Sequence, residues 1–107
     1  MLYELRIYDV HSGKMKAIQD RFKDHVIPLF MNHGMKVLRF WEDADEANNR
    51  LYYLVEHADM QTRNLNYDRF RNDPEWIEVK RISELEGPIV YKQESVFLKN
   101  TDFFDNI

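Results

Sequence analysis

The stretch YELRIYDV, residues 3–10, decides the fold because it reads as a β-strand with two different faces. Side chains alternate between the two sides of a strand. The two sets are Tyr3, Leu5 and Ile7 on one side and Glu4, Arg6 and Tyr8 on the other. The first set is typical of a core. The second set faces water, a subunit or a ligand, and the function depends on which.

A helix is predicted directly after this strand. Apolar residues recur every three or four positions from Lys14 to His33, which is the spacing of an amphipathic helix. Ser12 is the expected N-cap, and Gly34 suits the left-handed position that ends a helix. Pro28 cannot donate a helical hydrogen bond, so we expect a kink or a weakened last turn there.

Two strands, a broken helical region and a last strand complete the chain. The corresponding segments are MKVLRFWED (35–43), RLYYLVEH (50–57), the helical residues 59–85 and IVYKQESVFLK (89–99). Asp59 and Asp73 are expected to cap the two halves of the helical region, with Pro74 at a first helical position. This order predicts an α+β, ferredoxin-like βαββαβ fold, a four-stranded antiparallel sheet with helices on one face.

The domain boundaries follow from this order. Residues 1–99 form a single domain, and residues 100–107 form a C-terminal tail. Phe103 and Phe104 are too apolar for free solvent. We therefore expect the tail to pack on the domain or on its partner.

The sheet face without helices predicts a homodimer. We expect the helices to cover Leu5, Ile7, Leu38 and Phe40, which leaves Arg6, Tyr8, Arg39 and Trp41 on the bare face. Trp41 with neighbouring Val37 makes a poor solvated surface. Two such sheets facing each other across a two-fold axis would form a dimeric α/β barrel.

Composition excludes several classes of function. The 107 residues are 44% hydrophobic and 32% charged, as in an ordinary globular protein. The formal charge of −4 argues against nucleic acid as a partner. No apolar span approaches the ~20 residues of a membrane helix, and no basic leader precedes the first strand. We expect a cytoplasmic protein without a membrane partner.

No cofactor or metal site is predicted. The chain has no cysteine, no glycine-rich phosphate-binding motif and only four histidines, none in a zinc pattern. His33 lies eight residues beyond His25 and could share a helix face with it, but two ligands make a weak site.

The charged residues of the predicted bare face have two interpretations. Glu4, Arg6 and Arg39 form either an ion-pair network at the dimer interface or a guanidinium site for a carboxylate or phenolate ligand. The candidate ligand-binding residues are Glu4, Arg6, Tyr8, Arg39 and Trp41, with Tyr53 as a further aromatic wall.

His57 and Tyr53 are the candidate catalytic residues. Glu56 and His57 are adjacent, so on a strand they point to opposite faces and do not form a dyad. His57 shares its face with Tyr53 by parity, and either could move a proton.

Five motifs in order make the chain resemble the NIPSNAP family. They are YELRIY at 3–8, FW at 40–41, NR at 49–50, NDPEW at 72–76 and QESVFLK at 93–99. The resemblance covers about Tyr3 to Lys99 and implies a dimeric α/β barrel. It implies no reaction, because NIPSNAP members mostly have none assigned.

Three functions remain open. The first is a small-molecule binding protein whose ligand lies in the cavity of a homodimeric barrel. The second is an enzyme resembling cofactor-independent monooxygenases, acting on an aromatic or phenolic substrate. The third is a protein-interaction module with a filled barrel.

Overall fold

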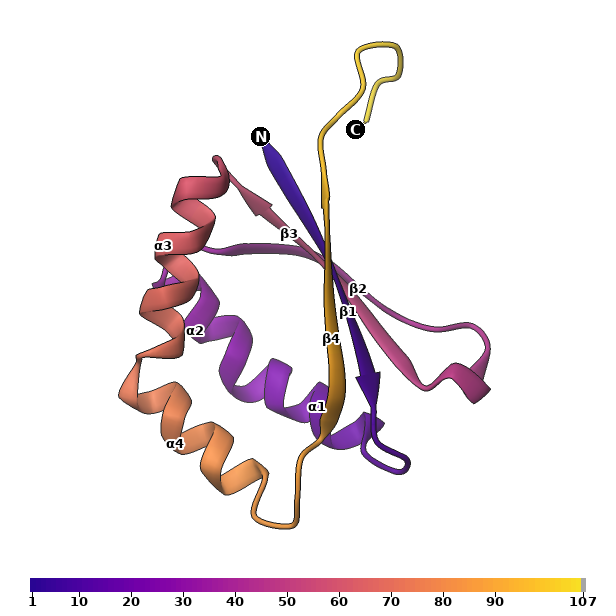
Figure 1. Ribbon diagram of the computed structural model, residues 1–107, viewed down its shortest axis with the longest axis vertical. Helices are drawn as coiled ribbons and strands as arrows, with labels where there is room; N and C mark the ends of the chain where they lie inside the picture. The colour runs from indigo at the N-terminus through magenta and orange to yellow at the C-terminus, as the bar shows by residue number, and fades with distance from the viewer. Residues whose placement is uncertain (107) are drawn as a thin grey trace.

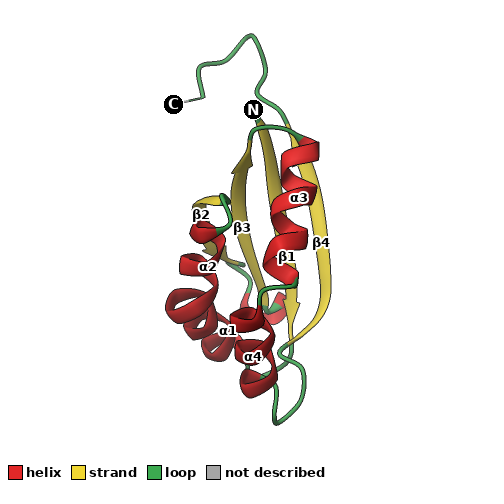
Figure 2. Cartoon of the chain, turned by 90° about the vertical axis from the view of Figure 1, so that its left-hand side faces the viewer, coloured by secondary structure: helices red, strands yellow, loops and turns green. Residues whose placement is uncertain are grey.

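The computed structural model describes residues 1–106 and consists of one sheet with its helices on one side (Figure 1). Figure 2 shows the same two layers from the helix side. In chain order the elements are β1 (Leu2–Val10), α1 (Met15–Arg21), η1 (Phe22–Val26), α2 (Ile27–Asn32), β2 (Lys36–Glu42), η2 (Glu46–Asn48), β3 (Arg50–His57), α3 (Met60–Arg71), α4 (Pro74–Ser83) and β4 (Val90–Leu98). The strands pair antiparallel in the order β2-β3-β1-β4. The predicted ferredoxin-like βαββαβ fold is confirmed.

In the described part of the chain, no helix has the length and apolarity needed to cross a bilayer.

The first helical region is continuous but changes its winding before Pro28. Its middle segment, η1, is a π-helical turn, and Pro28 is the second residue of α2. The Ile27 N–H donates to the Phe22 carbonyl five residues earlier, and the next residue is Pro28, which has no N–H to continue the helical hydrogen bonds. The predicted cap at Ser12 is wrong, because Lys14 is the N-cap position and no side chain caps it. Gly34 ends the region at φ +79, as predicted.

The second helical region is broken where the sequence predicts it. The Asp59 carboxylate accepts from the Thr62 N–H at 2.7 Å and caps α3. The Asp73 carboxylate accepts from the Glu75 N–H at 2.9 Å and caps α4, which begins at Pro74. Both caps are confirmed. No residue of α4 is buried, so this helix is the outermost part of the helical layer.

On β1, the structure reverses the predicted assignment of the two sheet faces. Arg6 lies opposite Tyr53 on β3, and Tyr53 packs against Phe22 of η1 with ring centroids 4.9 Å apart. This set of side chains therefore lies beneath the helices. Leu5 lies opposite Leu54 on the other face. The prediction that the helices cover Leu5 and Ile7 is wrong.

The physical reason for the reversal is that polar character does not mark solvent exposure here. Glu4 is fully buried, and Tyr8 is 8% exposed. Each has partners within the layer between sheet and helices, and a buried polar group is tolerated when it is hydrogen-bonded or paired. The residue pattern along β1 alone does not reveal these partners.

A register shift in β2 separates residues that the sequence places together. The shift lies between Val37 and Arg39, so Val37 and Phe40 pack against the core. Arg39 and Trp41 lie on the opposite face, opposite Leu54 and Tyr52. The prediction that the helices cover Phe40 is confirmed, since its partly buried ring lies 5.0 Å from that of Phe22 in η1. Leu38 is instead 37% exposed, and Val37 does not share a face with Trp41.

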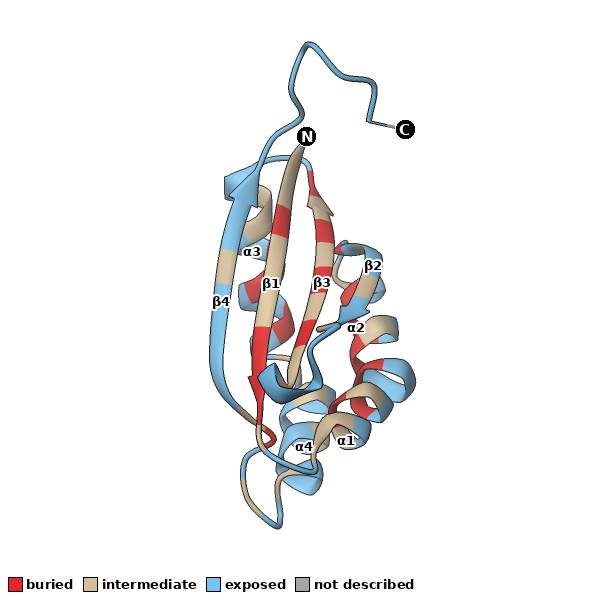
Figure 3. Ribbon diagram, turned by 90° about the vertical axis from the view of Figure 1, so that its right-hand side faces the viewer, coloured by how far each residue is buried: buried red, intermediate tan, exposed pale blue. Residues whose placement is uncertain are grey.

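Figure 3 shows the sheet from the side that no helix covers. We call this side the outer sheet face; its apolar members are Leu5, Ile7, Trp41, Tyr52, Leu54, Val96 and Leu98. Trp41, Val96 and Leu98 are 42%, 39% and 43% exposed. These residues form a patch of the kind that usually marks a binding surface.

The C-terminal tail extends beyond β4 and away from the helices (Figure 1). Phe103 is 86% exposed and Phe104 is 64% exposed. The expectation that these rings pack on their own domain is therefore wrong, while packing on a partner stays a prediction.

Candidate functional site

A cavity of about 860 Å³ lies between the sheet and the helices. Residues from β1, β4, the first helical region, α3 and α4 line it, and we call it the helix-side cavity. Its size falls within the usual range of small-molecule sites. Six of the chain's 15 aromatic residues (seven Phe, six Tyr and two Trp) form its walls: Tyr8, Phe22, Phe30, Tyr67, Phe70 and Trp76.

The helix-side cavity is cationic although the chain as a whole is acidic. Its lining includes Arg6, Arg21, Arg71, Lys80 and Arg81. Glu84 is the one carboxylate among the described lining residues, and it pairs with Arg21 at 3.0 Å. Carboxylates outside the lining pair with three other cations: Glu4 with Arg6, Asp68 with Arg71 and Glu78 with Arg81. The chain carries a formal charge of −4, so this concentration of positive charge is local. It favours an anion inside the cavity.

Helix α4 forms the outer wall of the cavity. Trp76 stacks on Phe70 of α3 with centroids 4.9 Å apart. The Arg21 guanidinium lies 5.2 Å from the centre of the Trp76 ring and donates to the Ser83 hydroxyl at 3.1 Å. These contacts hold α4 against the first helical region and place its cations along the cavity.

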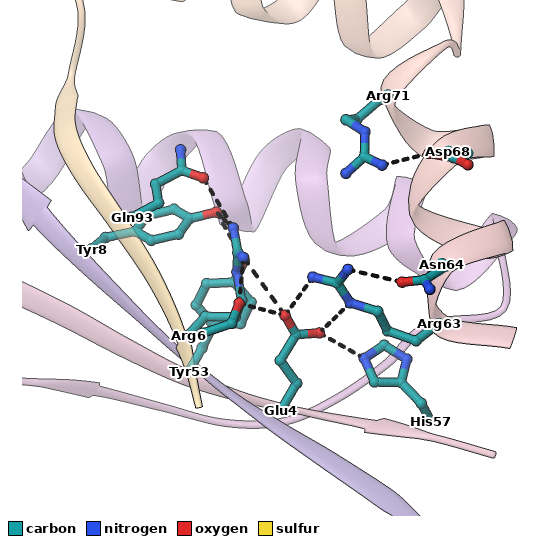
Figure 4. Close-up of polar contacts among 11 residues, drawn as sticks. Glu4, Arg6, Tyr8, Tyr53, His57, Arg63, Asn64, Asp68, Arg71 and Gln93 are labelled. Carbon is teal, nitrogen blue, oxygen red and sulfur yellow. Dashed lines mark hydrogen bonds and ion pairs between the residues drawn. The ribbon is translucent and has the colours of Figure 1, made fainter. Parts of the chain in front are cut away.

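Behind the cavity wall, Glu4 is the centre of a buried polar network (Figure 4). Its Oε2 accepts from Arg63 at 2.7 Å and from Ser95 at 2.6 Å, and its Oε1 lies 3.0 Å from Nε2 of His57. Burial alone would raise the pKa of Glu4, but these three hydrogen-bonding partners lower that pKa to about 2. The carboxylate is therefore ionised at neutral pH and serves as the counter-ion for nearby guanidinium groups.

Arg6 connects this network to the cavity. Its guanidinium lies 3.6 Å from Glu4 Oε2 and donates to the Tyr53 hydroxyl at 3.3 Å. The hydroxyls of Tyr8 and Tyr53 lie 2.9 Å apart. Burial, followed by the neighbouring phenols Tyr8 and Tyr67, raises the pKa of Tyr53. Tyr53 is therefore a neutral phenol at physiological pH.

The sheet separates the residues predicted to bind a ligand. Arg6 and Tyr8 line the helix-side cavity, and Glu4 lies behind them. Arg39 and Trp41 lie on the opposite face of the sheet. The predicted single wall of these five residues does not exist.

The two predicted catalytic residues lie on the helix side but do not line the cavity. Tyr53 is fully buried and contacts the lining residues Tyr8, Arg6 and Phe22 without lining the cavity itself. His57 points to the helix side and Glu56 to the other, which confirms that the two form no dyad. The partner of His57 is Glu4, 53 positions away in sequence.

The prediction missed several residues of this site that come from α3. Arg63 binds Glu4, and Tyr67 and Phe70 line the cavity. Their spacing of four and three positions was a usable signal, because it places all three on one helix face. Their partners on β1 could not be read from that spacing.

Among residues 1–106, no group of three or more histidine or acidic side chains has a geometry that could hold a metal ion. His33 instead contacts Asp73 at 2.7 Å, at the start of α4.

Comparison with known proteins identifies relatives over nearly the whole chain. The sequence model of the NIPSNAP family matches residues 3–104. No curated protein matches the chain.

Solved structures show the same fold. An uncharacterized NIPSNAP domain protein from Burkholderia xenovorans is 24% identical with a TM-score of 0.82, covering 99% of this chain and 100% of that one. A NIPSNAP family protein with unknown function from Agrobacterium tumefaciens is 18% identical with a TM-score of 0.84, covering 100% and 94%. A putative antibiotic biosynthesis monooxygenase from Nitrosomonas europaea is 10% identical with a TM-score of 0.63, covering 94% and 98%. At these identities the likeness is one of fold.

Proposed function

The chain belongs to the NIPSNAP family, and we propose that it binds a small anionic molecule with an aromatic or other apolar body. The observation that carries this proposal is the helix-side cavity, which combines aromatic walls with five cationic side chains in an acidic protein. Small-molecule sites typically pair an apolar lining with a few placed polar groups. The ligand lies between the sheet and the helices of one subunit, since Arg6 and Tyr8 face that space.

We further propose that two chains associate through their outer sheet faces. Trp41, Val96 and Leu98 are each about 40% exposed there, beside the aliphatic side chains of β1 and β3. A two-fold pairing of these patches buries the same surface on both subunits. The dimer then closes a barrel whose ligand sites lie outside it, one beneath each helical layer.

A set of ligands with one ring and different charges tests the binding proposal. Benzoate, benzamide and benzylamine would be titrated into the protein by calorimetry, with larger aromatic acids following. Benzoate is expected to bind more tightly than benzamide, and benzylamine to bind least, because of the cationic lining. Equal binding of benzylamine and benzoate, or no binding of any aromatic acid, would contradict the proposal.

A pair of arginines on α3 provides a matched test of the site. Arg71 lines the cavity, whereas Arg69, two residues earlier, does not. Both are exposed and lie in the last turn of the helix. Arg71→Gln is expected to weaken benzoate binding about two- to fivefold, as for an exposed charge pair. Arg69→Gln is expected to leave it unchanged, and equal losses in both variants would place the anion elsewhere.

An oxygen-using enzyme is the second candidate. It is supported by the fold shared with the putative monooxygenase and by the contact between Tyr8, which lines the cavity, and Tyr53. Through that contact a proton could pass between a phenolic substrate and the buried phenol. His57 has less support in this role, because its Nε2 contacts Glu4 and no atom of it lines the cavity.

Oxygen uptake separates binding from catalysis. Wild-type protein would be tested with quinols and other phenols, then Tyr53→Phe and His57→Ala with any active substrate. Loss of uptake in Tyr53→Phe with retained ligand binding would support the enzyme. Absence of uptake by the wild type with every phenol would contradict it and leave the binding function.

A further inference from the structure

Tyr67 of α3 lines the helix-side cavity, and its hydroxyl has no hydrogen-bond partner among the described residues. The residue is only 4% exposed, so bulk water does not replace the missing partner. Buried tyrosine hydroxyls usually find a partner, and an unpaired one destabilises the folded chain. Such a loss of folding stability is often retained where the group binds a ligand.

Tyr53 is a neighbouring phenol and acts to lower the pKa of Tyr67, but no hydrogen bond of regular geometry joins the two hydroxyls. The Tyr53 hydroxyl accepts from Nε of Arg6 at 3.3 Å and lies 2.9 Å from the Tyr8 hydroxyl. Both of these phenols are therefore engaged with each other and with Arg6. Tyr67 is the phenol of this cluster that is left without a bond.

Three guanidinium groups surround Tyr67; Glu4 is the counter-ion of two of them, Arg6 and Arg63, and Asp68 pairs with the third. The guanidinium carbons of Arg63, Arg6 and Arg71 lie 4.4, 5.5 and 5.7 Å from the centre of its ring. Burial raises the pKa of Tyr67, and the charge of Arg6 opposes that rise without reversing it. The hydroxyl therefore stays protonated at neutral pH and acts as a donor among cations.

We propose that Tyr67 is the residue that selects the ligand's anionic group, donating its hydroxyl hydrogen to a carboxylate or phenolate oxygen. This inference rests on the binding function proposed above. A donor beside guanidinium groups favours a negatively charged acceptor over a neutral one. Arg6 contributes positive charge but does not orient the ligand, because its guanidinium already donates to Tyr8, Tyr53, Gln93 and Ser95.

The rings next to Tyr67 define the rest of the ligand. Phe30 lies 5.8 Å from Tyr67 and 4.8 Å from Phe70, and Phe70 lies 4.9 Å from Trp76, all between ring centroids. This row of rings leads from the unpaired hydroxyl to α4. Its flat apolar surface suits an aromatic body that stacks or packs edge-on. The ligand class is therefore an aromatic carboxylate or phenolate, with its oxygen at Tyr67 and its ring toward Trp76.

The variant Tyr67→Phe tests this assignment, because it removes the hydroxyl and keeps the ring. Stability without ligand would be measured by urea unfolding, and the dissociation constants of benzoate and benzamide by calorimetry. The matched control is Tyr91→Phe, which loses a hydroxyl at a residue that is 61% exposed and does not line the cavity. Tyr67→Phe is expected to be at least as stable as wild type and to bind benzoate about tenfold more weakly. Benzamide should lose less, and the control should change in neither measurement.

Each alternative result contradicts a specific part of the two proposals. If wild type and Tyr67→Phe bind benzoate equally well, the role of Tyr67 is wrong and the binding function stands. If Tyr67→Phe is less stable than wild type, the hydroxyl has a structural partner in solution and the inference is also wrong. If wild type binds neither benzoate nor any larger aromatic acid, both proposals fail.

Discussion

Glu4 and Leu5 are neighbours in sequence, yet they lie on opposite faces of the sheet, one covered by helices and the other not. On the helix side, Glu4 is fully buried and its carboxylate contacts His57, Arg63 and Ser95. On the outer sheet face, Leu5 lies among aliphatic and aromatic side chains that no helix covers. The comparison teaches that paired polar groups of β1 can be buried beside an apolar core, while the apolar side chains around Leu5 remain available for another surface.

Removing the central charge of the helix side tests this comparison directly. Glu4→Gln leaves Arg6 and Arg63 without their shared counter-ion in a buried site. We expect a loss of roughly 3–5 kcal/mol in the free energy of unfolding, measured by urea denaturation. Glu94→Gln is the control, because Glu94 lies opposite Ile7 and is exposed. It should change stability by less than about 0.5 kcal/mol. Equal effects in the two variants would show that the Glu4 network contributes little.

The free energy of unfolding should depend on pH because the Glu4 carboxylate is protonated at low pH. The pKa of Glu4 is lowered from 4.5 to about 2 in the folded chain. A lowered pKa stabilises the folded state above about pH 4.5, and this stabilisation is lost as the pH falls toward 2. The shift corresponds to about 3 kcal/mol.

Urea unfolding at pH 7, 4.5, 3 and 2 would measure this loss. Glu4→Gln has no carboxylate to protonate, so its curve against pH should lack the corresponding component. Parallel curves for wild type and variant would assign the acid sensitivity to other groups.

The order of elements and most helix ends could be predicted from sequence because they depend on local chemistry. Asp59 and Asp73 cap helices through hydrogen bonds to residues two or three positions away. Gly34 ends a helix through its own backbone angle. Such signals lie within a few residues of the feature that they determine.

The faces of the sheet could not be predicted in the same way. The partner of Glu4 on α3 is 59 residues away, and Ser95 is 91 residues away. Arg39 and Trp41 lie on the face without helices as predicted, but Arg6 lies on the helix side, and the register shift in β2 separates Val37 from Trp41. Local alternation does not reveal a bulge or a distant counter-ion. The cavity residues of α3 lie on one face of the helix by their spacing. The sequence alone does not show that this face lines the cavity.

The outer sheet face can be tested separately from the cavity. Leu5→Asp introduces a charge at the centre of the apolar patch, and desolvating that charge in a dimer is unfavourable. If the wild type is a dimer, we expect its dissociation constant to rise about 30-fold or more, which corresponds to about 2 kcal/mol. Native mass spectrometry and light scattering measure both states, and benzoate binding should persist.

Leu65→Asp is the matched control for that experiment. Leu65 lies on α3, is 49% exposed and belongs neither to the cavity lining nor to the outer sheet face. It should not change the oligomeric state. A monomeric wild type at all concentrations would refute the dimer, and a dimeric Leu5→Asp would place its interface elsewhere.

The smallest change is expected from the tail, whose two rings, Phe103 and Phe104, are 86% and 64% exposed. Phe103→Ser combined with Phe104→Ser should alter the unfolding free energy of the monomeric Leu5→Asp variant by less than about 0.5 kcal/mol, because both rings are exposed. In the dimer, packing of the tail on the partner would make the same double change weaken association. A stability loss in the monomeric background would show that the tail packs on its own domain in solution. No effect in either background would mean that the two rings contact neither subunit. The chains would then associate through the outer sheet face without any contribution from the tail.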